Sequence, residues 1–218
     1  VQSSSISTVM TVSLVNAGLI ELKQAIGVIL GANIGTTVTG WILSVKVGKY
    51  GLLLIGLGIY PMMAGKTPRA SAIGKTFVAL GLIFTGLEFM SGAFTPLRTD
   101  QNFISYLHLF DAQTLGSLLA CVAIGCFLTV IIQSSSAMLG ITITLASTGV
   151  IDFHTAVALI IGENVGTTIT AQLAAIGANT SAVRTARAHA IFNLLGALIF
   201  IAMFPYYVEF IEWLVANP

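Results

Sequence analysis

Two stretches of this chain repeat one pattern: QSSSISTVMTVSLVNAGLIELKQAIGVILGANIGTTVTGW begins at Gln2, and QSSSAMLGITITLASTGVIDFHTAVALIIGENVGTTITAQ begins at Gln133. They align without a gap at an offset of 131 residues (133 − 2). The identities are mainly polar residues and glycines, in a QSSS motif and a G-x-N-x-G-T-T motif. Packing alone would fix the size of the apolar side chains at least as strongly. The pattern therefore predicts a duplicated unit that carries a functional site.

The composition identifies the surroundings of the chain. Of its 218 residues, 56% are hydrophobic and 8% are charged, whereas an ordinary soluble domain has about 25% charged residues. A soluble globule of this size could not bury so much apolar surface, and a disordered chain would be more polar. A net charge of +1 without a basic run excludes nucleic acid as a partner. We expect a membrane protein in contact with the lipid bilayer.

Gaps between charged residues predict the membrane spans, since a spanning helix needs about 20 apolar residues. The predicted spans are residues 25–45, 50–65, 72–94 and 155–176 and one between Arg187 and Glu209, with residues 114–150 as two spans or a re-entrant hairpin. The number of predicted membrane crossings between the two repeats means that the helix at 155–176 crosses the membrane in the direction opposite to that of its partner at 25–45. The fold expected is an all-α membrane protein with inverted repeats, QSSS-tipped re-entrant helical hairpins and interrupted transmembrane helices.

The repeat also predicts how the chain is divided. Residues 1–65 form the first inverted repeat and residues 66–218 the second, within one integral membrane domain. If the two copies are equivalent, the first lacks its N-terminal part. Basic residues collect on one predicted side, at Lys23, Lys66, Arg69, Lys75, Arg184 and Arg187. The positive-inside rule places this basic side in the cytoplasm of a multi-pass plasma-membrane protein, the inner membrane of a bacterium.

Each QSSS motif, at residues 2–5 and 133–136, lies between apolar arms that are short for full spans. A hairpin there would leave serines, which are favoured caps, at a helix N-terminus near mid-membrane. Such a terminus presents unpaired N–H groups and a positive dipole end, so two facing tips would form an anion site without Arg or Lys. The alternative is a surface turn with capping serines.

The motifs GANIGTT (31–37) and GENVGTT (162–168) interrupt apolar helices. Glycines and an amide favour a local break that frees carbonyl, amide and hydroxyl oxygens, the hard ligands that suit Na⁺. The alternative is close helix packing through G-x-x-x-G spacings. Glu163, which replaces Ala32, could bind a cation, carry a proton or be a structural acid. We expect His108, His154 and His189 at the membrane interface.

An enzyme is not expected. The serines lack a G-x-S-x-G context, and the two G-K-T sequences ending at Thr67 and Thr76 lack the first glycine of a Walker motif. No cluster of His and Cys suggests a metal site beyond sodium.

The paired QSSS and G-x-N-x-G-T-T motifs resemble those of the type II sodium/phosphate cotransporters, in a bacterial form that is N-terminally truncated. The resemblance implies that phosphate is framed by Gln2, Ser3, Ser4, Ser5, Gln133, Ser134, Ser135 and Ser136. It implies that Na⁺ is bound by Gln2, Ser4, Asn33, Thr36, Thr37, Gln133, Ser135, Asn164, Thr167 and Thr168. Glu163 departs from the small residue of other members and is the candidate for ion coupling.

The resemblance predicts Na⁺-coupled transport of inorganic phosphate by alternating access, without a cofactor. It leaves room for a homo-oligomer. Two alternatives use the same pocket: a non-transporting membrane phosphate sensor or assembly subunit, and a transporter of another oxyanion.

Overall fold

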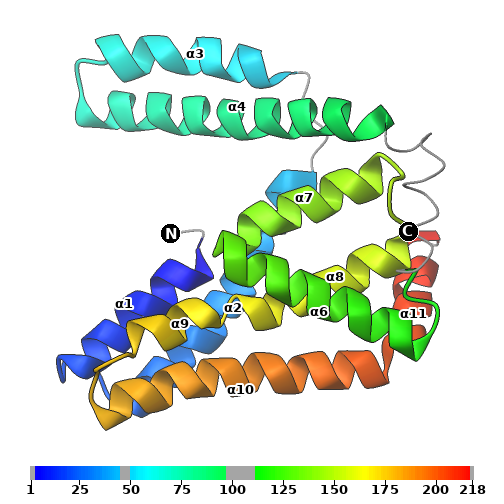
Figure 1. Ribbon diagram of the computed structural model, residues 1–218. Helices are drawn as coiled ribbons and strands as arrows, with labels where there is room; N and C mark the ends of the chain where they lie inside the picture. The colour runs from blue at the N-terminus through cyan, green and yellow to red at the C-terminus, as the bar shows by residue number, and fades with distance from the viewer. Residues whose placement is uncertain (1–2, 45–49, 97–110, 217–218) are drawn as a thin grey trace.

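The computed structural model describes residues 3–44, 50–96 and 111–216, and within these ranges its regular elements are helices (Figure 1). Gln2 and residues 98–110 of the predicted external segment lie outside the described residues. The helices are α1 (Ser4–Asn16), α2 (Leu22–Ser44), α3 (Gly51–Ala64), α4 (Pro68–Phe94), α6 (Leu115–Ile132), α7 (Ser135–Ser147), α8 (Phe153–Gly166), α9 (Ile169–Ala174), α10 (Thr180–Ala202) and α11 (Phe204–Ala216).

The helices confirm an all-α membrane protein. Among the described residues, α2, α4, α6 and α10 are long and apolar enough to cross a bilayer. Large apolar side chains remain exposed on them, such as Trp41 on α2 and Phe89 on α4. Helices suit lipid because every interior backbone group is bonded within its own segment. The short span expected at 50–65 is α3, which contains Pro61.

The duplication seen in the sequence is present in the backbone. Helices α1 and α7 are both 13 residues long and begin and end at matched positions. Each has a serine N-cap in extended conformation, Ser3 and Ser134. The glycines that follow the two helices, Gly18 and Gly149, have φ values of 72° and 71°, a conformation that glycine adopts without steric cost. The opposite orientation of the copies and the membrane depth of the hairpin tips stay predictions.

The two G-x-N-x-G-T-T segments differ from each other. In the second copy, α8 ends at Gly166 and α9 begins at Ile169, so the expected break is confirmed there. In the first copy, α2 continues through residues 31–37, and the break expected at GANIGTT is wrong. The threonines of GANIGTT bond back to carbonyls of the same helix, which is compatible with an unbroken helix.

Close packing explains part of this difference. A Cβ at Gly162 would overlap the Val122 carbonyl of α6, and one at Gly166 would overlap the Cys126 carbonyl. Glycine-mediated packing, the alternative role for the motif, therefore holds in the second copy. In the first copy, a Cβ at Gly31 or Gly35 would have no neighbour within 4 Å among the described residues.

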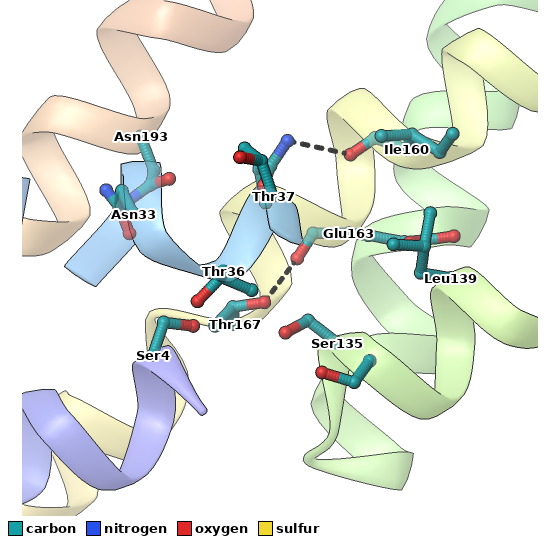
Figure 2. Close-up of a pocket in the computed structure, with 12 residues that line it drawn as sticks. Ser4, Asn33, Thr36, Thr37, Ser135, Leu139, Ile160, Glu163, Thr167 and Asn193 are labelled. Atoms are coloured by element: carbon teal, nitrogen blue, oxygen red, sulfur yellow. Dashed lines mark hydrogen bonds between the residues drawn. The ribbon is translucent and has the colours of Figure 1, made fainter. Parts of the chain in front are cut away.

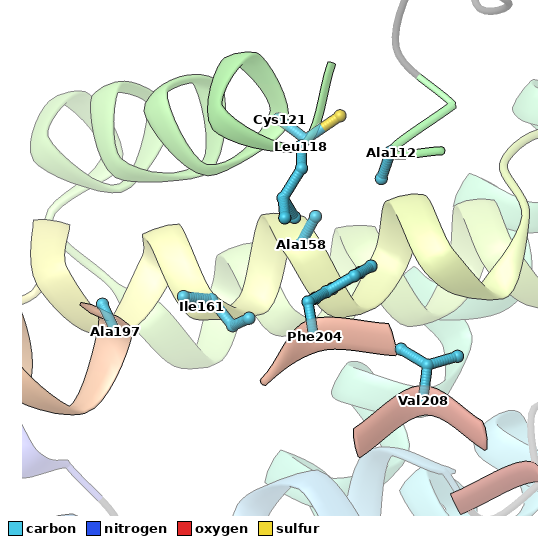
Figure 3. Packing of buried hydrophobic residues seen from close by; sticks show 8 residues of the cluster. All are labelled: Ala112, Leu118, Cys121, Ala158, Ile161, Ala197, Phe204 and Val208. Carbon is cyan, nitrogen blue, oxygen red and sulfur yellow. The ribbon is translucent and has the colours of Figure 1, made fainter. Parts of the chain in front are cut away.

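Two apolar clusters hold the helices around a central region. Figure 3 shows the first, in which Leu118 and Cys121 of α6 and Ala158 of α8 pack with Phe204 and Val208 of α11. The second joins α1, α2, α9 and α10 through small and branched side chains. The α3–α4 pair packs through glycines and lies at one edge in Figure 1, with α4 against α7. This arrangement brings the starts of α1 and α7 to the same part of the molecule.

Candidate functional site

A cavity of about 160 Å³, lined mainly by polar residues, lies where the starts of α1 and α7 meet the middle of α2 and α10 and the C-terminal end of α8 (Figure 2). Its volume far exceeds the roughly 10–15 Å³ that one water needs. It is lined by Ser4, Asn33, Thr36, Thr37, Ser135, Ser136, Leu139, Ile160, Glu163, Asn164, Thr167 and Asn193. None of these lining residues is basic, so an anion there would depend on dipoles, hydroxyls and accompanying cations for its charge balance.

In each tip, one serine caps the helix and the next serine lines the cavity. The Ser3 hydroxyl accepts a hydrogen bond from the Ile6 amide at 3.2 Å, and the Ser134 hydroxyl accepts one from the Ala137 amide at 3.3 Å. The next serines, Ser4 and Ser135, begin their helices and line the cavity. Two helix N-termini, which carry partial positive charge, therefore meet at one cavity.

The G-x-N-x-G-T-T motifs supply oxygen atoms from the other walls. The Thr36 hydroxyl donates to the Ala32 carbonyl at 3.0 Å, and the Thr167 hydroxyl donates to the Glu163 carbonyl at 2.7 Å (Figure 2). A hydroxyl that donates to its own helix keeps its oxygen lone pairs for another partner. Lone pairs on neutral oxygens are the ligands that Na⁺ prefers.

The structure brings together about half of the residues predicted for the site. The predicted residues that line the cavity are Ser4, Asn33, Thr36, Thr37, Ser135, Ser136, Asn164 and Thr167. The predicted residues that do not line it, although they lie next to lining residues in the sequence, are Ser3, Ser5, Gln133, Ser134 and Thr168. Gln133 links α6 to α7 with a φ of 55°. Gln2 lies outside the described residues. Which ion each residue binds stays a prediction.

Glu163 lines the cavity and is 3% exposed. Its carboxylate accepts a hydrogen bond from the Thr142 hydroxyl of α7 at 2.6 Å. The matched positions of the first copy are Ala32 and Thr11, where the Thr11 hydroxyl donates to its own helix at the Ser7 carbonyl. The second copy therefore places a carboxylate at the cavity, and the first does not.

Two residues of α10 were not assigned to the site from the sequence. Asn193 lines the cavity, and its only sequence signal is a polar residue within an apolar stretch. His189 is fully buried among the helices, and its expected position at the membrane interface stays a prediction. The two residues are four positions apart and therefore share one face of α10.

A helical membrane protein whose two copies place helix N-termini and hydroxyl oxygens around one cavity has the features of an ion transporter. The model of the Na⁺/Pi-cotransporter family matches residues 1–92 and 105–212, and the chain belongs to this family. The family consists of transporters and not of enzymes.

Known proteins support the assignment. The chain is 34% identical over 221 residues to "Uncharacterized protein YqeW" of Bacillus subtilis, a match that covers 100% of this chain and 69% of that protein. It is 35% identical over 199 residues to "Putative inorganic phosphate export protein YjbB" of Escherichia coli. That match covers 91% of this chain, which thus spans only 36% of the length of the Escherichia coli protein.

A shorter match connects the chain to an animal protein. It is 41% identical over 94 residues to human "Sodium-dependent phosphate transport protein 2C", covering 41% of this chain and 16% of that protein. No solved structure matches the chain.

Proposed function

We propose that the protein transports inorganic phosphate across a bacterial inner membrane and couples this movement to Na⁺. The observation that carries the proposal is the meeting of the α1 and α7 N-termini at one cavity. Family membership supports phosphate as the substrate, and the human relative named for sodium-dependent phosphate transport supports the coupling ion.

Phosphate would bind between the two tips. Backbone N–H groups at the starts of α1 and α7, with the hydroxyls of Ser4, Ser135 and Ser136, would donate to its oxygens. Helix N-termini hold phosphate without a basic residue because their unpaired N–H groups already point at the ligand. The QSSS glutamines and the remaining serines would complete this frame.

Sodium would bind beside the phosphate on hydroxyl and amide oxygens of both copies. The first copy would supply Asn33, Thr36 and Thr37, and the second Asn164, Thr167 and Thr168. Cations at these positions would neutralise the anion in a cavity without basic lining residues. Glu163 would add one fixed negative charge to the second copy.

Alternating access would then follow from movement of one copy against the other around the shared cavity. The direction in the cell depends on the gradients. The Escherichia coli relative is named for export, so both directions should be measured.

The decisive experiment measures radiolabelled phosphate flux in proteoliposomes, in both directions, with a Na⁺ or a K⁺ gradient. Ser4→Ala and the Ser135→Ala/Ser136→Ala pair should abolish Na⁺-dependent flux. Ser13→Ala is the matched control, because Ser13 is exposed on α1 and bonds only to the Val9 carbonyl of its own helix. Phosphate binding without flux would refute transport, and flux equal in Na⁺ and K⁺ would refute sodium coupling.

A further inference from the structure

Helix α11 is too short to cross a bilayer and turns away from the helix before it. It contains 13 residues, which span about 20 Å at about 1.5 Å per residue, whereas the hydrocarbon core of a bilayer is about 30 Å thick. Figure 1 shows α11 running across the end of α10, beside the starts of α6 and α8. Because α6 and α10 are long enough to span the membrane, a helix across their ends lies close to the membrane plane.

One face of α11 holds it against the bundle. Phe204 and Val208 are 3% and 1% exposed, and they pack with Leu118 of α6 and Ala158 of α8 (Figure 3). The Phe204 ring also lies 6.3 Å from the ring of His154 near the start of α8, measured between ring centres. This face therefore belongs to the protein core.

The opposite face of α11 is aromatic and exposed. Tyr206, Phe210 and Trp213 follow one another at spacings of four and three residues, which places them on one side of the helix. Their side chains are 56% to 73% exposed, and the ring centres of Phe210 and Trp213 lie 6.3 Å apart. Tyr and Trp are enriched at membrane–water interfaces, where one end of each ring system is apolar and the other is wet. The composition of this face is therefore typical of an interfacial helix.

A narrow polar stripe separates the two faces. At about 100° per residue, Glu209 and Glu212 lie roughly a quarter turn from the buried face on one side and from the aromatic face on the other. On the side opposite the stripe, the Tyr207 ring contacts the Phe200 ring of α10, with ring centres 4.9 Å apart. Phe200 is itself exposed on α10, a spanning helix. The exposed apolar surface of α10 thus continues onto α11, away from the two carboxylates.

An apolar cavity of about 260 Å³ lies between α11 and the start of α8. Its lining consists of Phe153, Ile211, Glu212, Val215 and Ala216, of which only Glu212 is charged. An apolar lining with one polar group at hand suits an aliphatic ligand. The upper part of a lipid acyl chain is such a ligand, and it lies at the depth of an interfacial helix.

We propose that α11 binds the headgroup–acyl boundary of the phospholipid bilayer, with Tyr206, Phe210 and Trp213 in the lipid and with Glu209 and Glu212 in water. Lipid, and not a second copy of the chain, is the partner because the aromatic face adjoins the apolar surface that α10 presents to the bilayer. Through its buried face, α11 then fixes the membrane depth of the ends of α6 and α8. The proposal does not depend on the proposed transport function.

Charged residues assign the leaflet. Among the described residues at the α11 end of the bundle, the two glutamates of α11 and Asp152 at the start of α8 are acidic. At the other end of α10, Arg184 and Arg187 lie in its first turns and are exposed. The positive-inside rule places the arginine end in the cytoplasm, so α11 lies in the opposite leaflet.

The test measures the depth of Trp213, which Trp41→Phe leaves as the single tryptophan of the chain. In bilayers of brominated phospholipid, bromine near the headgroup should quench most of the Trp213 emission, and bromine at the chain ends should quench much less. Phe192→Trp, placed at the exposed middle of α10 in a chain without other tryptophans, is the depth control and should show the reverse order. Trp213 emission that neither lipid quenches, or that chain-end bromine quenches most, would overturn the proposal.

Single cysteines test the orientation, in a chain whose native cysteines are replaced by alanine. In right-side-out membrane vesicles, Glu212→Cys should react with a membrane-impermeant maleimide, whereas Phe210→Cys, two residues away, should not. Equal reaction of the two thiols would show α11 surrounded by water, and a disulfide between two chains at Phe210→Cys would assign the aromatic face to a second copy. Reaction of Glu212→Cys only in opened vesicles would refute the assigned leaflet. None of these readouts uses phosphate flux, so a protein without transport activity leaves them unchanged.

Discussion

Thr142→Val tests whether Glu163 is held as a charged group at the cavity. Valine keeps the shape of threonine but removes the hydroxyl that donates to the buried Glu163 carboxylate at 2.6 Å. A hydrogen bond to a charged group contributes about 1.5–3 kcal/mol, and its loss leaves a buried acceptor unsatisfied. We therefore expect Thr142→Val to lower the free energy of unfolding by about 1.5–3 kcal/mol.

The first copy provides a matched control. Thr11 occupies the position of Thr142 in the repeat, and its hydroxyl donates only to the Ser7 carbonyl of its own helix. Such a local bond stabilises a helix little, so Thr11→Val should cost less than about 1 kcal/mol. Unfolding in detergent micelles, titrated with sodium dodecyl sulfate, would measure both values.

A double-mutant cycle with Glu163→Gln then isolates the pair. In the Glu163→Gln background, the cost of Thr142→Val should fall towards that of a neutral hydrogen bond, about 0.5–1.5 kcal/mol. Contacting side chains should show this coupling, whereas Thr11→Val should be additive with Glu163→Gln. Equal costs for the two threonine variants, or no coupling in the cycle, would show that Glu163 is neutral or bonded elsewhere, and the charge assigned to the second copy would be wrong.

Three further predictions follow from the same geometry. Glu163→Gln should raise the Na⁺ concentration for half-maximal phosphate flux by about tenfold or more. A carboxylate within about 4 Å of a cation contributes up to about 4 kcal/mol at an effective dielectric of 20. An unchanged Na⁺ dependence would exclude Glu163 from the cation site. Asn16→Cys/Asn179→Cys, oxidised to a disulfide in a background without the native cysteines, should stop flux until a reductant is added, because Asn16 and Asn179 join α1 of one copy to α10 of the other. Full flux in the oxidised form would show that α1 and α10 do not separate at this end during transport. Gly162→Ala should prevent stable folding because its Cβ would overlap a carbonyl of α6, whereas Gly31→Ala at the matched position should be tolerated. Equal melting temperatures of the two purified variants in a thermal-shift assay would contradict this prediction.

Much of the architecture could be predicted from the sequence because the residues that match between the two repeats are mainly polar residues and glycines. Serines and glycines have few roles in an apolar helix, so matched copies at Ser3 and Ser134 indicated caps, and Gly18 and Gly149 proved to be positive-φ positions after the helices. The meeting of the two tips at one cavity followed from the same symmetry.

The differences between the copies were harder to predict. A glycine motif allows a helix to break or to pack closely, and the outcome depends on its neighbour. Gly162 and Gly166 meet α6, and the helix breaks directly after them, whereas α2 continues past Gly31 and Gly35. Likewise, nothing in a single sequence shows that His189 is fully buried, because its burial depends on which helices pack against α10.

These differences give the two halves of the cavity different mechanical properties. On the second copy's side, α8 is locked to α6 by backbone contacts at Gly162 and Gly166, which leave no room for relative movement without separation. By contrast, α1 and α10 pack through side chains, and each holds one buried polar side chain without a hydrogen-bond partner among the described residues, Thr8 and His189. Contacts between side chains can rearrange more easily than interlocked backbones. We therefore expect α6 and α8 to move as one body, and the contact between α1 and α10 to be where the structure opens.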